Sequence, residues 1–543
     1  MLALEVVVVL AAAILVSTLL AQRLRIAPPI LLLACGALLG FVPALAQVQL
    51  PPEAVLLVFL PALLYWESIT TSLREIRSNL RGVALMSTLL VFATAAAVAS
   101  IAHLFGVPWG PAWVLGAAVA PTDATAVGAL TRSLPRSDVT SLRAESLVND
   151  GSALVLYGIA VSATVGEMQV GALSIGGSLV LSYGGGFLAG CLVAAIAVWA
   201  RPRLKNAMIE NVAILLTPFT AFLLAELIHA SGVLAVVTAG LIMSQAGPRV
   251  GKAAARQQTE SFWSLATFLL NGSLFVLVGI QLQGVVQDLT GASLGLGLAL
   301  VAVVSVCLVV VRLAFLFITA YTIRALDRRP SQRRRRMSNR SRVVSGLAGF
   351  RGAVSLAAAL AVPATMTDGT PFPDRSLIIF VTAGVIVVTI VGQGLTLPAV
   401  VRWAKLPKDT SVSEERLFAE TTFYKAALAD LPEIARRLGT DAEVTERLRT
   451  EYEEHLEELD AETRAFEKDD RPDAPGDTSK NAEPAAVRRR RQMVELRLAL
   501  LRHKRATMIE LRDEKRIDDI VLRQLQDRLD IEEVRLTGRA PVE

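Results

Sequence analysis

The sequence has little of what disulfide-rich, metal-binding or nucleotide-driven proteins depend on. Its 543 residues include three cysteines, Cys35, Cys191 and Cys307, which lie in apolar stretches and form no Cys-x-x-Cys pair. This pattern gives no support to a disulfide framework or a zinc site. A glycine-rich nucleotide-binding loop is also missing, which argues against a primary pump. The net charge of +5 is too small to indicate a nucleic-acid-binding surface.

Long apolar runs are absent from the last part of the chain, although 53% of all residues are hydrophobic. Up to about residue 405, apolar runs recur that match the roughly 20 residues needed to cross a bilayer. We therefore expect an all-α polytopic membrane domain in residues 1–405 and a helical cytoplasmic tail in residues 406–543. A polar linker is expected at about residues 469–486, and the leucine-rich pattern after it favours coiled-coil or dimer packing.

The hydropathy pattern of the first part predicts thirteen transmembrane helices. Lysine and arginine gather in alternate connections between these spans, and such connections stay in the cytoplasm. We therefore expect the N-terminus outside and the tail in the cytoplasm, which requires an odd number of spans. The expected spans are about residues 2–21, 28–46, 52–69, 82–105, 111–130, 139–163, 170–200, 207–228, 232–246, 260–281, 290–323, 342–363 and 375–403.

Two of these spans are interrupted in similar ways. The fifth contains Pro121-Thr122-Asp123, and a proline in mid-helix removes a backbone hydrogen bond. The twelfth contains Gly349-Phe350-Arg351-Gly352, followed by Pro363. The breaks lie seven spans apart, so the two copies run in opposite directions, which is typical of an inverted-repeat transporter with its site at the midplane. The alternative is ordinary proline and glycine whose freed backbone groups are satisfied by neighbouring helices.

The sixth span, about residues 139–163, carries an unusual polar stretch, Glu145-Ser146-Leu147-Val148-Asn149-Asp150-Gly151. A charged residue near the bilayer centre costs about 2.5–3.5 kcal/mol on insertion scales, so such residues are rare and usually functional. At about 100° per residue, its four polar side chains share one broad helical stripe. The pattern predicts an ion or proton site, and the alternative is a buried structural network between helices.

Asp123 and Asp150 are the candidate carboxylates of this site, with Thr122 and Ser146 as neighbouring oxygen ligands. Hard alkali cations bind carboxylate, hydroxyl and carbonyl oxygens, and an unwound helix frees carbonyl groups for this purpose. A buried aspartate can hold a proton or a cation but does not favour both together. Competition for one carboxylate, combined with alternating access, is sufficient for exchange.

Four ordered motifs resemble the monovalent cation:proton antiporters of the NhaP type, and the same pattern is shared with the eukaryotic sodium/proton exchangers. They are Pro121-Thr122-Asp123, Glu145-Ser146-Leu147-Val148-Asn149-Asp150-Gly151, Gly349-Phe350-Arg351-Gly352-Ala353-Val354-Ser355 and Gln393-Gly394-Leu395-Thr396-Leu397-Pro398. The resemblance covers residues 1–405. It implies secondary active antiport of a monovalent cation, first of all Na+, against H+ in pH and sodium homeostasis.

The resemblance implies a role for each position of the ion site. Asp150 would be the carrier of both the cation and the proton, Asp123, Thr122 and Ser146 would complete the site, and Asn149 would support it. Electrogenic relatives have two adjacent aspartates where this chain has Asn149-Asp150. One titrating carboxylate at that place implies one proton exchanged per cation, and hence electroneutral transport.

Two further positions follow from the same resemblance. Glu145 and Arg351 would form a structural ion pair between core helices, which suits the preference of arginine for a buried carboxylate partner. Glu67, after an apolar-aromatic run in the third span, loosely matches an acidic position of the family. It is expected to be either an indirect cation ligand or an interfacial glutamate.

The resemblance also implies a homodimer in the cell membrane. Residues 82–163 and 290–403 would form a moving core, and residues 2–69 and 207–281 would form the dimer scaffold. Alternative functions are a K+/H+ antiporter of the same fold, a cation channel and an intramembrane aspartyl protease. Neither Asp123 nor Asp150 follows the Gly-x-Gly of a protease signature. Beyond Na+, Li+ or K+, H+ and the bilayer, no partner, cofactor or transition metal is expected.

Overall fold

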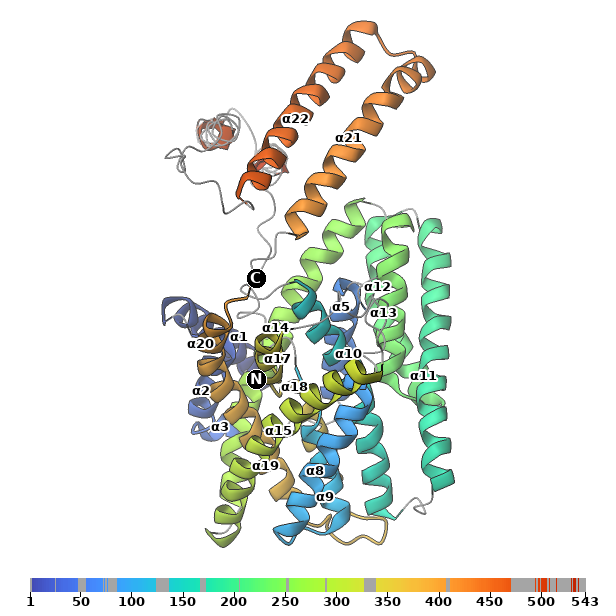
Figure 1. Cartoon of the computed structure of the whole chain (residues 1–543). Coiled ribbons are helices and arrows are strands. Elements are labelled where there is room, and N and C mark those ends of the chain that lie inside the picture. The colour runs from blue at the N-terminus through green and yellow to red at the C-terminus, as the bar shows by residue number, and fades with distance from the viewer. Residues whose placement is uncertain are drawn as a thin grey trace. The chain divides into compact units, whose positions relative to one another are not determined.

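The structure is a computed structural model of the chain (Figure 1). It describes residues 2–24, 26–46, 55–71, 73, 76, 85–123, 136–166, 172–204, 206–250, 253–288, 291–326, 338–406 and 411–469, with scattered positions between 494 and 536. Over these ranges the chain is helical, and its extended pairing is limited to one bridge between Thr365 and Pro371. The chain divides into two units, Met1–Lys408 and Asp409–Glu543.

The helices of the first unit confirm the expected all-α membrane fold. Of the helices described, eight are long and apolar enough to cross a membrane, and four more apolar helices are shorter. Several expected spans fall on these helices within a few residues, for example 207–228 on α12 (Ala207–Leu227), whereas α14 (Ala253–Asp288) is longer at both ends than its expected span 260–281. The helices are α1 (Leu2–Leu24), α2 (Pro28–Leu39), α3 (Pro43–Ala46), η1 (Val55–Phe59), α5 (Leu60–Thr70), η2 (Leu85–Leu89), α8 (Leu90–Leu104), α9 (Trp109–Val119), α10 (Arg136–Val165), α11 (Ala172–Ala200), η4 (Arg201–Arg203), α12 (Ala207–Leu227), α13 (Gly232–Val250), α14 (Ala253–Asp288), α15 (Gly291–Leu326), α17 (Asn339–Leu347), α18 (Ala353–Leu360), α19 (Arg375–Val388), η5 (Thr389–Gln393) and α20 (Gly394–Ala404).

Side-chain caps fix the starts of two helices that follow polar connections. The Asn206 side chain accepts a hydrogen bond of 2.8 Å from the backbone N–H of Met208 at the start of α12. Ser338 accepts one of 3.0 Å from the backbone N–H of Ser341 at the start of α17. Such caps satisfy N–H groups that have no partner within the helix. Local sequence therefore sets where these two helices begin.

Three apolar clusters hold the first unit together. One joins α8, α9, α10, α15, α18 and α19. A second joins α5, α11, α12 and α13 with part of α14, and α11 lies at the edge of the bundle in Figure 1. The third joins α1, α2 and α14 with α17 and α19. In this third cluster a Cβ atom on Gly36 would collide with the carbonyl oxygen of Val276, so glycine allows α2 and α14 to pack backbone to backbone.

Both expected helix interruptions are present. Helix α9 ends at Val119 and the chain continues without helix through Asp123, while residues 348–352 separate α17 from α18. The second half of the fifth expected span, residues 124–130, lies outside the described residues. The two breaks meet, because the backbone N–H of Asp123 donates a 2.8 Å hydrogen bond to the carbonyl oxygen of Phe350. The structure thus places the breaks of two distant segments side by side.

The second unit contains a helical hairpin, α21 (Ser411–Leu438) and α22 (Ala442–Asp469), in the part of the chain where a helical tail is expected. Gly439, with φ of 65°, makes the turn between the two helices. Tyr424 packs on Tyr452 and His455 with ring centroids 5.4 and 4.6 Å apart. Most of the expected linker and the coiled-coil segment after it lie outside the described residues.

Candidate functional site

The polar stretch of the sixth span lies on α10 and is buried. Glu145, Ser146, Asn149 and Asp150 are each 5% exposed or less. Because residues three and four apart share one side of a helix, these side chains face the point where the two helix breaks meet. The expectation of a buried polar stripe on this span is therefore met by the geometry.

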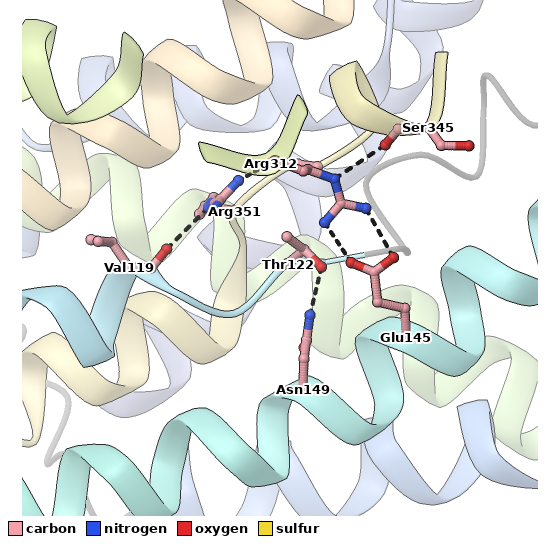
Figure 2. A network of polar contacts seen from close by, with 8 residues as sticks. Val119, Thr122, Glu145, Asn149, Arg312, Ser345 and Arg351 are labelled. Atoms are coloured by element: carbon pink, nitrogen blue, oxygen red, sulfur yellow. Dashed lines mark hydrogen bonds and ion pairs between the residues drawn. The ribbon is translucent and has the colours of Figure 1, made fainter. Parts of the chain in front are cut away.

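Thr122 ties the first break to α10. Its hydroxyl oxygen accepts a 2.7 Å hydrogen bond from the side-chain N–H of Asn149, and both residues are buried (Figure 2). The next residue, Asp123, lies over Gly352 at the start of α18, where any Cβ atom would collide with the Asp123 carboxylate. The first turn of a helix presents unsatisfied N–H groups and favours a negative charge. The structure thus brings Thr122, Asn149 and Asp123 together as expected of a single site.

Three carboxylates from three elements converge here. Glu67 on α5, Asp123 after α9 and Asp150 on α10 lie close enough for each pair to repel electrostatically. One carboxylate oxygen of Glu67 and the side-chain oxygen of Asn149 are buried without a hydrogen-bond partner among the described residues. Like charges held together in a buried place favour the uptake of a proton or a cation, which relieves their repulsion. The arrangement can therefore bind a cation, protons, or either in turn.

Glu145 is neutralised by an arginine that the sequence analysis did not single out. The Arg312 guanidinium on α15 donates hydrogen bonds of 2.5 and 3.0 Å to the two carboxylate oxygens of Glu145, and a third of 3.1 Å to the carbonyl oxygen of Ser345 (Figure 2). The predicted ion pair of Glu145 with Arg351 is therefore wrong. Arg312 lies inside a long apolar run. A charged residue in an apolar segment is the same feature that identified Glu145, so it could also have identified Arg312.

Arg351 bonds to backbone carbonyl groups, which explains why the predicted ion pair with Glu145 does not form. Its Nε donates a 3.0 Å hydrogen bond to the carbonyl oxygen of Val119, the last residue of α9, and its Nη1 donates one of 2.5 Å to the carbonyl oxygen of Gly349. Each helix break leaves carbonyl groups without a partner and a partial negative charge at the helix end. The buried Arg351 guanidinium satisfies both ends at once, so its donors are directed at the backbone.

The chain matches the model of a known transporter family. The family model described as the transmembrane sodium/hydrogen exchanger matches residues 9–403, the part that holds both helix breaks and all three carboxylates. The chain belongs to the sodium/hydrogen exchanger family. It is accordingly a multi-pass membrane protein of a family of cation/proton exchangers, which are transporters.

Two relatives agree with this assignment, and one solved structure shares the fold. An uncharacterized Na+/H+ exchanger of Mycobacterium tuberculosis is 44% identical over 542 residues, which are 99% of this chain and 97% of the relative. A sodium, potassium, lithium and rubidium/H+ antiporter of Bacillus pumilus is 31% identical over 386 residues, 68% of this chain and 57% of the relative. The sodium proton antiporter MjNhaP1 from Methanocaldococcus jannaschii shares the fold, with a TM-score of 0.58 and 19% identity over 74% of this chain and 99% of that one.

Proposed function

We propose that the protein exchanges Na+ for H+ by alternating access, with Asp150 as the carrier of both ions. The main support for this proposal is that two buried carboxylates on one helix differ in whether they are paired with an arginine. Glu145 is held by two hydrogen bonds from Arg312. Asp150, five residues or about 1.4 turns further along α10, forms no ion pair with any described residue and faces two other carboxylates. A buried carboxylate that has no fixed positive charge beside it is suited to bind a mobile cation or a proton.

The neighbours of Asp150 supply the rest of a cation site. Asp123 and Ser146 would add a carboxylate and a hydroxyl oxygen, and Thr122 is held in place by Asn149. Oxygen ligands of this kind suit alkali cations. Since Asn149 carries no charge, one carboxylate would titrate at this position on α10. This supports a 1:1 exchange that moves no net charge.

The moving parts would be two groups of helices. Residues 82–163 and 290–403 supply most of the apolar cluster around α8, α9, α15 and α19, and would form the core. Residues 2–69 and 207–281 include α2 and α14, which pack backbone to backbone, and would form the rigid scaffold of a homodimer. Rocking of one bundle against another around a midplane site is a general transporter scheme. The basic connections would place the N-terminus outside and the tail in the cytoplasm.

Potassium is the second candidate cation, because the relative from Bacillus pumilus is named for four alkali ions. Sodium and potassium differ in size and in the cost of dehydration, so cavity shape decides between them. A cation channel is the alternative of another class. Channel flux would not require proton counterflow, and pores are usually lined by rings of carbonyl groups or charges.

The decisive experiment uses proteoliposomes with an acidic lumen and a pH-sensitive dye inside. Addition of Na+ is expected to alkalinise the lumen, and Asp150→Asn is expected to abolish this signal. Asp368→Asn is the matched control, because Asp368 lies in an exposed turn and hydrogen-bonds to Thr370. Repeating the assay with K+ and Li+ identifies the preferred cation. Alkalinisation that persists in Asp150→Asn would remove the carrier role from Asp150, and cation flux without proton movement would favour a channel.

A second measurement tests the stoichiometry. Electroneutral exchange is expected to proceed at the same rate at zero membrane potential and at an imposed potential, and to generate no potential of its own. A rate that changes several-fold with the imposed potential would contradict the 1:1 proposal while leaving antiport itself intact.

A further inference from the structure

The motif that begins at Gln393 lies across a π-helical turn in the last span. Helix α19 changes at Thr389 into η5, which ends at Gln393, and α20 continues from Gly394. A π-helical turn is rare, appears mostly within a longer α-helix, and is frequent at functional sites. Because the motif contains no carboxylate, its role depends on the segments that η5 contacts.

Gln393 supplies hydrogen-bond donors to the second helix break, residues 348–352, and to the helix end before it. Its side chain is buried at 7% exposure, and its amide N–H groups donate to the carbonyl oxygens of Leu347 and Gly349 at 3.2 and 3.3 Å. The opposite orientation of the amide would direct its oxygen at these acceptors, so the nitrogen occupies this place. Leu347 is the last residue of α17, and a helix end leaves carbonyl groups without an intrahelical partner. Gln393 thus caps the end of α17 from another span.

Thr389, one turn earlier on the same element, contacts the same break. The backbone N–H of Arg351 donates a 3.4 Å hydrogen bond to the Thr389 hydroxyl oxygen, and this hydroxyl donates one of 3.1 Å to the carbonyl oxygen of Ile386. Both Thr389 and Arg351 are buried. A separation of 3.4 Å is long for an N–H···O bond, so this contact is weaker than those of Gln393. Two polar side chains of η5 therefore bond to the backbone of residues 347–351.

The same stretch of backbone holds Asp123. The carbonyl oxygen of Phe350 accepts the 2.8 Å hydrogen bond from the backbone N–H of Asp123, and the absence of a side chain at Gly352 makes room for the Asp123 carboxylate. Both contacts lie within three residues of Gly349, so a displacement of the break relative to η5 would move both. A binding site needs its ligands held to within about 0.5 Å by neighbours that are themselves fixed. The hydrogen bonds thus connect η5 to Asp123 through the break.

We propose that Gln393 and Thr389 are positioning residues of the cation site, because they hold the second helix break where Asp123 needs it. The inference rests on the proposed exchange at Asp150. In this role neither side chain of η5 binds the cation. Each acts through backbone groups of the break, and the affinity for the cation is the property that their loss would change.

The contacts predict unequal contributions from the two residues. The Gly349 carbonyl oxygen also accepts a hydrogen bond from Nη1 of Arg351, so it keeps one donor when Gln393 is replaced. The Leu347 carbonyl oxygen loses the donor that Gln393 provides, and a carbonyl group left without a donor inside a protein is costly. The longer bond of Thr389 predicts a smaller effect.

The first test measures the Na+ dependence of exchange in proteoliposomes that contain the full chain. Gln393→Met keeps the length of the side chain but has no N–H group. It is expected to raise the KM for Na+ by about tenfold, as for one lost hydrogen bond, while Vmax changes less than twofold. Gln281→Met is the matched control, because it makes the same replacement at a partly buried position of α14. Its KM is expected to equal that of the wild type.

Thr389 allows a milder version of the same test. Thr389→Val removes the hydroxyl and should raise the KM by roughly threefold, in line with its weaker bond. Thr389→Ser keeps the hydroxyl and should restore the wild-type KM. The matched control is Thr396→Val, since the exposed Thr396 hydroxyl bonds to carbonyl groups of its own helix, at Gly392 and Gln393. These variants carry the test if Gln393→Met does not fold.

Hydrogen exchange gives a readout that does not need transport. The backbone N–H of Asp123 is protected by its bond to Phe350, so an unsettled break should expose it to solvent more often. Mass spectrometry of the purified chain is expected to show several-fold faster exchange at Asp123 in Gln393→Met than in the wild type or in Gln281→Met.

The outcomes separate this inference from the proposed function. Wild-type vesicles without any cation-dependent proton movement would contradict the exchange itself. Normal exchange with a wild-type KM in Gln393→Met, or an equal rise in Gln281→Met, would overturn the positioning role alone. A lower Vmax at constant KM would assign Gln393 to folding instead. Unchanged hydrogen exchange at Asp123 in Gln393→Met would overturn the route through the break.

Discussion

The Arg312 guanidinium donates hydrogen bonds of 2.5 and 3.0 Å to the two carboxylate oxygens of Glu145, although the two residues are 167 positions apart in the chain. Both side chains are buried, so the pair joins α10 to α15 inside the protein. Removing one partner of a buried ion pair leaves an uncompensated charge, which typically costs about 3–5 kcal/mol. The pair therefore fixes the position of α10, the helix that carries Asp150 of the proposed ion site.

The first prediction follows from this pair. Arg312→Gln should destabilise the protein by about 3–5 kcal/mol, measured as a fall of the Tm in detergent. The double variant Glu145→Gln with Arg312→Gln should recover part of that loss, because neither side chain is then a buried unpaired charge. A double variant that is less stable than the single one would show that the pair contributes through something other than mutual neutralisation.

Arg351 gives the second prediction, because it bonds to backbone carbonyl groups at two helix ends. Arg351→Gln should leave at least one buried carbonyl group without a donor and cost about 1–3 kcal/mol of stability. Arg351→Lys keeps the charge but has no planar fork, so an intermediate Tm is expected. Thermal unfolding of the three proteins in one detergent provides the comparison. Equal Tm values for wild type and Arg351→Gln would refute the capping role.

The third prediction concerns Gly352, where there is no room for a side chain. A methyl group at this position would collide with the carboxylate of Asp123, whereas a methyl group on Gly158 of α10 would meet no atom of another described segment within 4 Å. Gly352→Ala should therefore displace Asp123 and lower the exchange rate at least tenfold, and Gly158→Ala should leave it unchanged. Cation-dependent alkalinisation of proteoliposomes measures both rates. Full activity in Gly352→Ala would mean that the placement of Asp123 is not critical.

The fourth prediction concerns the hydrogen bond between Asn149 and Thr122, which is 2.7 Å long and buried. Asn149→Ala removes the donor and leaves the Thr122 hydroxyl without this partner, a loss of about 1–3 kcal/mol. We expect a rise in the KM for Na+ of roughly tenfold, in line with that energy. Thr122→Ser keeps the acceptor oxygen and should stay near the wild-type KM. A KM in Asn149→Ala equal to that of the wild type would separate this bond from cation binding.

The sequence by itself determined the membrane fold and the candidate residues of the site. Apolar runs of about 20 residues are local properties of the chain, and α12 lies within one residue of its expected span. The cost of burying a charge is equally local, and it identified the stretch from Glu145 to Asp150 before any neighbour was known. The helix breaks at Pro121 and Gly349 were also visible, because proline and glycine act on their own backbone.

Only the tertiary structure decided which of these residues meet. Both Arg312 and Arg351 are arginines in apolar segments, and nothing in their local sequence says which one faces Glu145. The choice depends on how α15 packs beside α10 and on the carbonyl groups that the two helix breaks leave open near Arg351. The approach of Glu67 to Asp123 and Asp150 likewise depends on packing between α5 and α10. Partners far apart in the chain are selected by packing and by backbone groups that need a partner, and neither can be read from hydropathy or spacing.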